Sequence, residues 1–142
     1  MIVLNTLTHA VSEYNWTFQS ITPTHAGDAA GLYALGGDLD DTQPIVAELV
    51  TGTTLFDSSL KKHTEMVYFS VTGEGSGELI VRGKSDEYRY TFPIRPSGQS
   101  RQQPGKGIRE NYLAYGFSNP DGEHFQLDRI EALIAQSKTR RV

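Results

Sequence analysis

Three neighbouring aspartates, Asp38, Asp40 and Asp41, are the first residues whose chemistry could hold a ligand. Carboxylate oxygens are ligands that Ca²⁺ prefers, and a calcium loop supplies about six to eight oxygens and ends with a bidentate carboxylate. The spacing here is Asp-x-Asp-Asp, with no glutamate at the distance that such a loop requires. We therefore favour a solvated acidic turn, and the sequence leaves a bound ion at these residues open.

Two glycine-rich stretches resemble phosphate-binding loops in part. Gly73, Gly75 and Gly77 do not have the spacing of the dinucleotide fingerprint, and the glutamates beside them would repel a phosphate. The Pro-Gly-Lys-Gly sequence around Lys106 lacks the hydroxyl residue that follows the lysine of a P-loop, and it lacks the earlier glycine. We therefore predict a tight turn at 73–77 and no nucleotide binding.

The side chains that could take part in catalysis do not form any recognised catalytic or metal-binding motif in the sequence. The histidines, His9, His25, His63 and His124, are not spaced as metal-ligand pairs. His63 and Glu65 would share one face of a strand, where a plain surface pair is favoured over an acid–base pair. The chain has no cysteine, which excludes disulfides and thiolate sites, and no serine stands in a nucleophile elbow. We therefore expect no enzymatic activity and no cofactor.

A cluster of basic residues lies in the segment 95–110, which has no hydrophobic periodicity and is predicted to be a long exposed loop. Its members are Arg95, Arg101, Lys106 and Arg109. Long loops without secondary structure are often functional, so docking on an acidic partner and a solvated loop are equally supported. Tyr112 joins these interface candidates, because Tyr and Arg are enriched at interface anchors.

Three aromatic residues, Tyr14, Trp16 and Tyr88, could offer stacking faces to sugar rings. The competing interpretation is that Trp16 belongs to the core. The sequon Asn15-Trp16-Thr17 is set aside, because the first five residues lack the basic and apolar regions of a signal peptide.

The composition indicates which elements must position these side chains. The 142 residues carry 13 Lys and Arg against 17 Asp and Glu, and a formal net charge of −4 argues against nucleic-acid binding by bulk electrostatics. No stretch approaches the roughly 20 apolar residues of a membrane span. Fourteen glycines, seven tyrosines and six phenylalanines favour tight turns and pleated strands. We predict an all-β fold, either an antiparallel β-sandwich or a small partly open barrel, as one domain over 1–142.

Period-two alternation and short apolar runs predict the strands. They are expected at 14–21, 31–35, 45–50, 66–71, 78–82, 87–94 and 111–118. We expect 66–71 and 78–82 to pair as a hairpin around the glycine turn. Pro23 and 25–28 should interrupt the chain after the first strand, and the nearby prolines should place 87–94 at a sheet edge.

Two segments fit more than one conformation. Residues 1–13, a candidate N-terminal arm, combine helical spacing with β-branched residues. Residues 123–136 fit a strand or a helix, and we favour a strand with a bulge near Asp128, which places Phe125 and Ile130 on one face.

Several short motifs follow one another through about 120 residues. They are Asn5-Thr6 with His9-Ala10-Val11 and Tyr14; Trp16-x-Phe18-x-Ser20; Gly31-Leu32-Tyr33-Ala34-Leu35-Gly36-Gly37 with Asp38 and Asp40, before Pro44-Ile45; Thr51-Gly52, Leu55-Phe56 and Lys61-Lys62 before Val67-Tyr68-Phe69; Gly105-Lys106-Gly107-Ile108-Arg109 with Asn111-Tyr112; Phe125-x-Leu127-Asp128-x-Ile130-Glu131; and Arg140-Arg141-Val142. In this order they resemble the C-terminal module of tail structural proteins of tailed bacteriophages, of the tail-tip, baseplate or nozzle type. Glu110 departs from that pattern, where a small or basic residue is expected.

The resemblance implies a β-rich virion component, made in the host cytoplasm, with no enzymatic residues to carry over. We expect it to form a multi-copy ring that contacts copies of itself and other tail proteins, without nucleic-acid specificity or a membrane span. Ring symmetry would repeat modest contacts around the tail axis. A carbohydrate-binding β-sandwich that contacts host surface glycans is the alternative, and a small β-barrel enzyme is the least favoured.

Overall fold

The computed structural model describes residues 2–9, 11–13, 16–37, 39–40, 42–136 of the chain. All regular elements in these residues are β-strands, and every pairing between them is antiparallel. The strands are β1 (Ile2–Leu4), β2 (Val11–Glu13), β3 (Ser20–Ile21), β4 (His25–Gly27), β5 (Leu32–Ala34), β6 (Leu39–Asp40), β7 (Gln43–Pro44), β8 (Glu48–Val50), β9 (Lys62–Gly73), β10 (Ser76–Arg82), β11 (Glu87–Pro93), β12 (Ser100–Gln102), β13 (Ala114–Ser118) and β14 (Phe125–Gln136). The predicted all-β class is confirmed.

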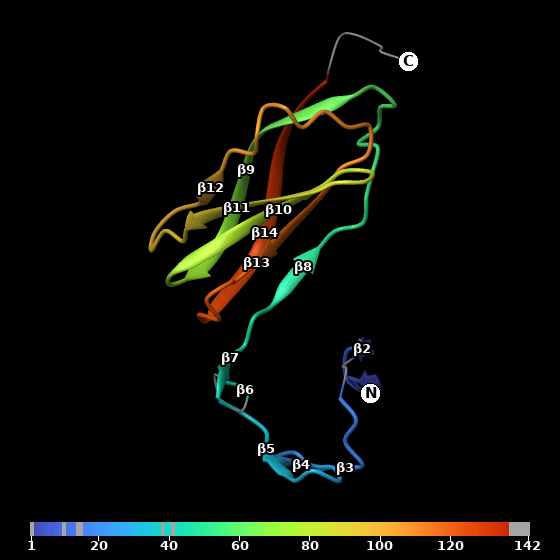
Figure 1. Ribbon diagram of the computed structural model, residues 1–142, viewed down its shortest axis with the longest axis vertical. Coiled ribbons are helices and arrows are strands. Elements are labelled where there is room, and N and C mark those ends of the chain that lie inside the picture. Colours follow the sequence, from blue (N-terminus) through green and yellow to red (C-terminus); the bar gives the residue numbers. More distant parts are fainter. Residues whose placement is uncertain (1, 10, 14–15, 38, 41, 137–142) are drawn as a thin grey trace. The chain divides into compact units, whose positions relative to one another are not determined.

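The chain divides into two compact units, Met1–Asp38 and Leu39–Val142. We predicted one sandwich domain over 1–142, whereas the strands that face each other across a core all lie in the second unit (Figure 1). The difference has a simple physical basis. Among the described residues of the first unit, Ala26 is the only buried hydrophobic residue.

The first unit consists of short strands. β1 pairs with β2, so 2–4 and 11–13 are extended, with a turn at 6–8 between them, and β3, β4 and β5 form a three-stranded sheet. The strand predicted over 14–21 is wrong for its described part before Ser20, because the rings of Trp16 and Phe18 pack on each other, with centroids 5.4 Å apart, outside any sheet. Residues 14 and 15 lie outside the described residues. The predicted break at 25–28 is also wrong over His25–Gly27, which forms β4.

The second unit is a sandwich of two sheets. One has the strand order β11-β10-β13-β8, and the other has the order β12-β9-β14 (Figure 1). Alternate residues of β9, β10 and β13 point into the core between them. Its buried residues are Val67, Phe69, Val71, Leu79, Val81, Phe92, Ile94, Ile108, Leu113, Tyr115 and Phe117.

The predicted hairpin of 66–71 with 78–82 is wrong. β9 and β10 belong to different sheets, so the glycine turn carries the chain across the sandwich instead of returning it beside itself. Gly73 and Gly75 have φ values of 156° and 73°, a region that favours glycine. The residues of the turn and of the strands on either side of it are consistent with a hairpin. β9 and β10 do not pair because each takes other partner strands, β12 and β14 for β9 and β11 and β13 for β10.

The bulged strand predicted for 123–136 is confirmed. The register of β14 on β9 shifts between Leu127 and Arg129, so Asp128 is the extra residue. The shift brings Ile130 onto the same core-facing side as Phe125 and Leu127. The edge position predicted for 87–94 is also confirmed, because β11 ends the four-stranded sheet.

The segment 95–110 is not the uniformly exposed loop that was predicted. Ser100–Gln102 forms β12, which pairs with β9, and Ile108 is buried in the core. Ser100 is fully buried, and its hydroxyl accepts a hydrogen bond from the backbone N–H of Arg95 at 2.9 Å. A three-residue strand is too short to show a period, so the sequence pattern does not reveal it.

Gly77 offers a test of the core. A Cβ there would lie 2.6 Å from Cε2 of Phe117 and 3.0 Å from Cζ of Phe92, both of them buried rings. We expect Gly77→Ala to lower the free energy of unfolding by about 1–3 kcal/mol, because overpacking displaces these rings. Urea denaturation monitored by circular dichroism measures the change.

Gly107→Ala is the matched control, because nothing lies within 4 Å of a Cβ at Gly107. It should leave the stability unchanged or raise it by up to about 1 kcal/mol. Equal effects of the two substitutions would contradict the packing described for Phe117.

Candidate functional site

The structure does not gather the basic interface candidates into one cluster. Arg101 lies on β12, opposite Tyr68 of β9 and in the same row as Glu131 of β14. Arg95 precedes β12, and its backbone is tied to Ser100. These two residues therefore lie at and near the short edge strand β12.

Arg109 and Tyr112 lie toward the opposite end of β9. Glu110, between them, forms an isolated bridge with Lys62 at the start of β9. Lys62 and Phe69, the partner of Ser100, are seven positions apart on this strand, which corresponds to on the order of 23 Å. Lys106 is exposed, in the turn that leads to this end. The candidates thus form an exposed row along one side of the sandwich instead of a pocket.

Lys62 is the unexpected residue at this end. It is 1% exposed, and its Nζ donates to three main-chain carbonyls, those of Ser58, Leu60 (2.8 Å) and Asn111 (3.2 Å). The three N–H donors of an ammonium group thus meet three acceptors. These hydrogen bonds join the loop before β9 to Asn111, which lies three residues before β13.

The loop that Lys62 holds contains a strained turn. Phe56 and Asp57 have φ values of 43° and 58°, and the N–H of Ser58 donates to the carbonyl of Leu55 at 3.1 Å. Left-handed backbone costs a non-glycine residue on the order of 1–3 kcal/mol. The ring of Phe56 lies 5.9 Å from that of Tyr115, which anchors the turn on the core.

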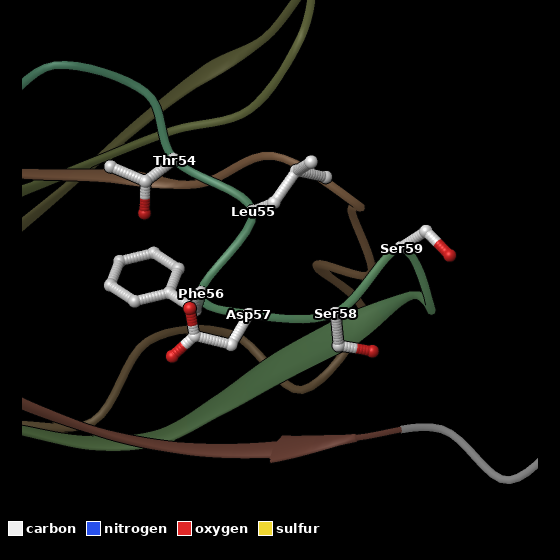
Figure 2. Close-up of a pocket in the computed structure, with 6 residues that line it drawn as sticks. All are labelled: Thr54, Leu55, Phe56, Asp57, Ser58 and Ser59. Carbon is white, nitrogen blue, oxygen red and sulfur yellow. The ribbon is translucent and has the colours of Figure 1, made fainter.

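This turn lines an open hollow of about 600 Å³ (Figure 2). The lining residues are Thr54, Leu55, Phe56, Asp57, Ser58 and Ser59, which follow one another along a single stretch of chain. Ligand sites usually combine side chains from several elements around a concave apolar surface. The hollow has no such convergence, and we assign it no ligand.

The outer face of the four-stranded sheet carries an ion network. Arg89 of β11 contacts Glu48 at 2.9 Å, Glu78 at 3.0 Å and Glu87 at 2.6 Å, and Glu87 also pairs with Arg82. The hydrogen bonds that Arg89 donates to Glu48, Glu78 and Glu87 raise the pKa of Arg89 above its usual range, and the hydrogen bonds that Glu87 accepts from Arg82 and Arg89 lower the pKa of Glu87. The arginines and glutamates of this face are paired with one another, so the face offers few unpaired charged side chains to a partner.

The aromatic candidates separate between the two units. In the first unit, Trp16, Phe18 and Tyr33 form a continuous group, with centroid distances of 5.4 and 5.5 Å. Trp16 is 42% exposed, so it is not the core residue that the competing interpretation required. Tyr88 lies in the second unit, on β11, and is 37% exposed. Tyr14 lies outside the described residues.

The described residues include no group of three or more His, Cys, Asp or Glu side chains placed to hold a metal ion. Asp38 and Asp41 of the acidic turn are outside the described residues, whereas Asp40 pairs with Gln43 in the two-residue strands β6 and β7. Glu65 occupies the register irregularity of β9 between His63 and Met66, so simple alternation does not place it on one face with His63.

Sequence reasoning missed the roles of Lys62 and of the turn at Phe56. The dipeptide Lys61-Lys62 gave one signal, because it stands before a strongly alternating strand. It did not show which lysine faces inward, since burial depends on the bulge in β9.

No family model, no curated protein and no solved structure matches this chain. Across the described part of the chain, there is no helix long and apolar enough to cross a membrane. The arrangement of the residues is therefore what supports a functional proposal.

Lys62 supplies the test for this end of the sandwich. Lys62→Met keeps the apolar stem and removes the buried ammonium donors, which leaves the partly buried carbonyls of Ser58, Leu60 and Asn111 without this partner. We expect the free energy of unfolding of the second unit to fall by about 3 kcal/mol. Urea denaturation measures this, and proteolysis at 54–61 should become faster.

The neighbouring lysine provides a control, because Lys61 is exposed. Lys61→Met should change the stability by less than about 0.5 kcal/mol. If both variants were as stable as the unaltered chain, Lys62 would not hold the loop.

Proposed function

We propose that this chain is a structural component of a bacteriophage tail, at the tail tip, baseplate or nozzle, and that it assembles in several copies as a ring with neighbouring tail proteins. The order of motifs that resembles tail proteins supports this proposal. In this proposal the protein has a mechanical role. The sandwich serves as a rigid body, and its surface residues and the separate first unit contact neighbouring subunits in the virion.

The exposure of the first unit is the observation that carries the proposal. Its exposed large hydrophobic residues are Ile2, Val3, Leu4, Leu7, Val11, Trp16, Ile21, Leu32 and Tyr33. Units below about 40 residues usually need disulfides, metals or partner chains for stability. The chain has no cysteine, and contact with neighbouring subunits would cover these side chains.

Arg101 on β12 and Lys106 in the turn that follows it supply a second contact surface. Arg101 and Lys106 are exposed, and the charges on the neighbouring four-stranded sheet are paired with one another. Exposed cations of this kind suit an acidic patch on a neighbouring tail protein, where they would set orientation and association rate.

Charge reversal tests this surface. In cells that supply the other tail proteins, the double variant Arg101→Glu/Lys106→Glu should reduce complete tails by about tenfold or more, because it places like charges against the acidic partner. Electron microscopy and infectivity titres measure the loss.

Lys61→Glu/Lys84→Glu is the matched control, since it makes the same change in net charge at two other exposed lysines. It should assemble as the unaltered chain does. Normal numbers of tails with the Arg101/Lys106 variant would count against the proposed contact.

The exposed aromatic group in the first unit favours one alternative, a carbohydrate-binding module for host surface glycans. Sugar rings stack on exposed aromatic faces, and Trp16 and Tyr33 are 42% and 40% exposed.

Fluorescence can test this alternative, because Trp16 is the single tryptophan of the chain. If the alternative holds, host polysaccharide should change the tryptophan emission with a saturable dependence, and Tyr33→Ala should weaken the response about tenfold or more. Tyr88→Ala, in the other unit, serves as the control. An unchanged emission at saturating polysaccharide would exclude stacking on Trp16.

A further inference from the structure

The long outer edge of β14 has no partner strand in the described part of the chain. β14 runs for 12 residues and pairs with β9 along one edge, whereas β12, at the other end of the same sheet, has 3 residues. An edge strand presents unpaired backbone N–H and C=O groups, which makes it a template for another strand.

The core is also less well covered along β14 than on the adjacent strand. Val67 and Phe69 of β9 are 0% exposed, whereas Leu127, Ile130 and Ile134 of β14 pack against the same core and remain partly exposed. A further strand beside β14 would cover these side chains, and it would also form hydrogen bonds with the unpaired N–H and C=O groups of the β14 backbone.

The charges on β14 indicate which strand fits. Arg129 and Glu131 lie on the outer face of the sheet, and their side chains are 62% and 61% exposed. Nη2 of Arg129 is 3.6 Å from Oε2 of Glu131. They belong to the stretch between the two register shifts of β14, where the strand is regular.

A second copy of β14, placed antiparallel and centred on Ile130, brings Arg129 of each copy opposite Glu131 of the other. Residues directly opposite each other on antiparallel strands share a face and interact, and opposite charges there are favourable. A register centred on Glu131 would instead place two carboxylates opposite each other. The charges therefore select the register centred on Ile130.

We propose that two copies of this chain associate through antiparallel pairing of their β14 strands about a two-fold axis at Ile130. Such a contact is isologous, since the same surface serves on both copies. The three-stranded sheets would join into one sheet of six strands. This inference rests on the proposed function for its biological role, where the isologous contact would be additional to the heterologous contacts that close a ring.

The test compares self-association of the purified full chain in three forms by sedimentation velocity over a concentration series. The unaltered chain should dimerise. Arg129→Glu should raise the dimer dissociation constant by about tenfold or more, because it sets two glutamates against each other twice. Arg129→Glu/Glu131→Arg should restore dimerisation, since the opposite charges meet again in the same register.

Both side chains are mostly exposed, so the three forms should unfold at the same temperature at concentrations below the dimer dissociation constant, where all of them are monomers. A shared melting curve under those conditions separates association from folding. A monomeric unaltered chain, an unaffected Arg129→Glu variant or a double variant that fails to recover would each overturn the β14 contact. These results would leave the proposed tail assembly standing, because charge reversal at Arg101 and Lys106 tests it separately.

Discussion

The fold of the second unit depends on burying one face of each of two antiparallel sheets against the other. Four phenylalanines show how the two layers meet. Phe69 of β9 stacks on Phe92 of β11 with centroids 4.6 Å apart, and Phe117 of β13 contacts Phe125 of β14 at 4.9 Å. Each ring pair joins one sheet to the other, and offset and tilted aromatic pairs add to the stabilisation from burial alone. This requirement explains why the chain crosses between the sheets after β9, even though a local hairpin was available.

At the end of the sandwich where β9 begins, hydrogen bonds hold the chain in addition to apolar packing. The stretch from Thr51 to Thr54 follows β13 through backbone hydrogen bonds, and the chain then makes the strained turn at Phe56 and Asp57. The buried ammonium group of Lys62 is satisfied by the main-chain carbonyls of this loop and of Asn111. A strained backbone persists where its surroundings hold it, and here the ring contact of Phe56 and the hydrogen bonds of Lys62 do so.

The surfaces of the two sheets differ in what they offer to neighbours. On the four-stranded sheet, Arg89 is surrounded by three glutamates, so the charges of that face are already paired. On the three-stranded sheet, Arg101, Tyr68 and Glu131 share one row, and the edge of β14 beyond them has no partner in the described residues. The sandwich therefore combines a face whose charges are paired with an edge that has no partner among the described residues, and the first unit exposes large hydrophobic side chains.

The sequence by itself determined the β class and the edge position of β11, because these follow from local alternation, prolines and turn residues. It favoured a bulged strand near Asp128 over a helix, and the structure decided between the two. The sequence could not determine that β9 and β10 lie in different sheets, that Ser100 forms a strand, or that Lys62 rather than Lys61 is buried. Those outcomes depend on which distant strands compete for each edge and on one-residue shifts of register, which reverse the face of every following side chain. The interface candidates show the same limit. Their residue types were readable in the sequence, whereas their separation along β9 was decided by tertiary pairing alone.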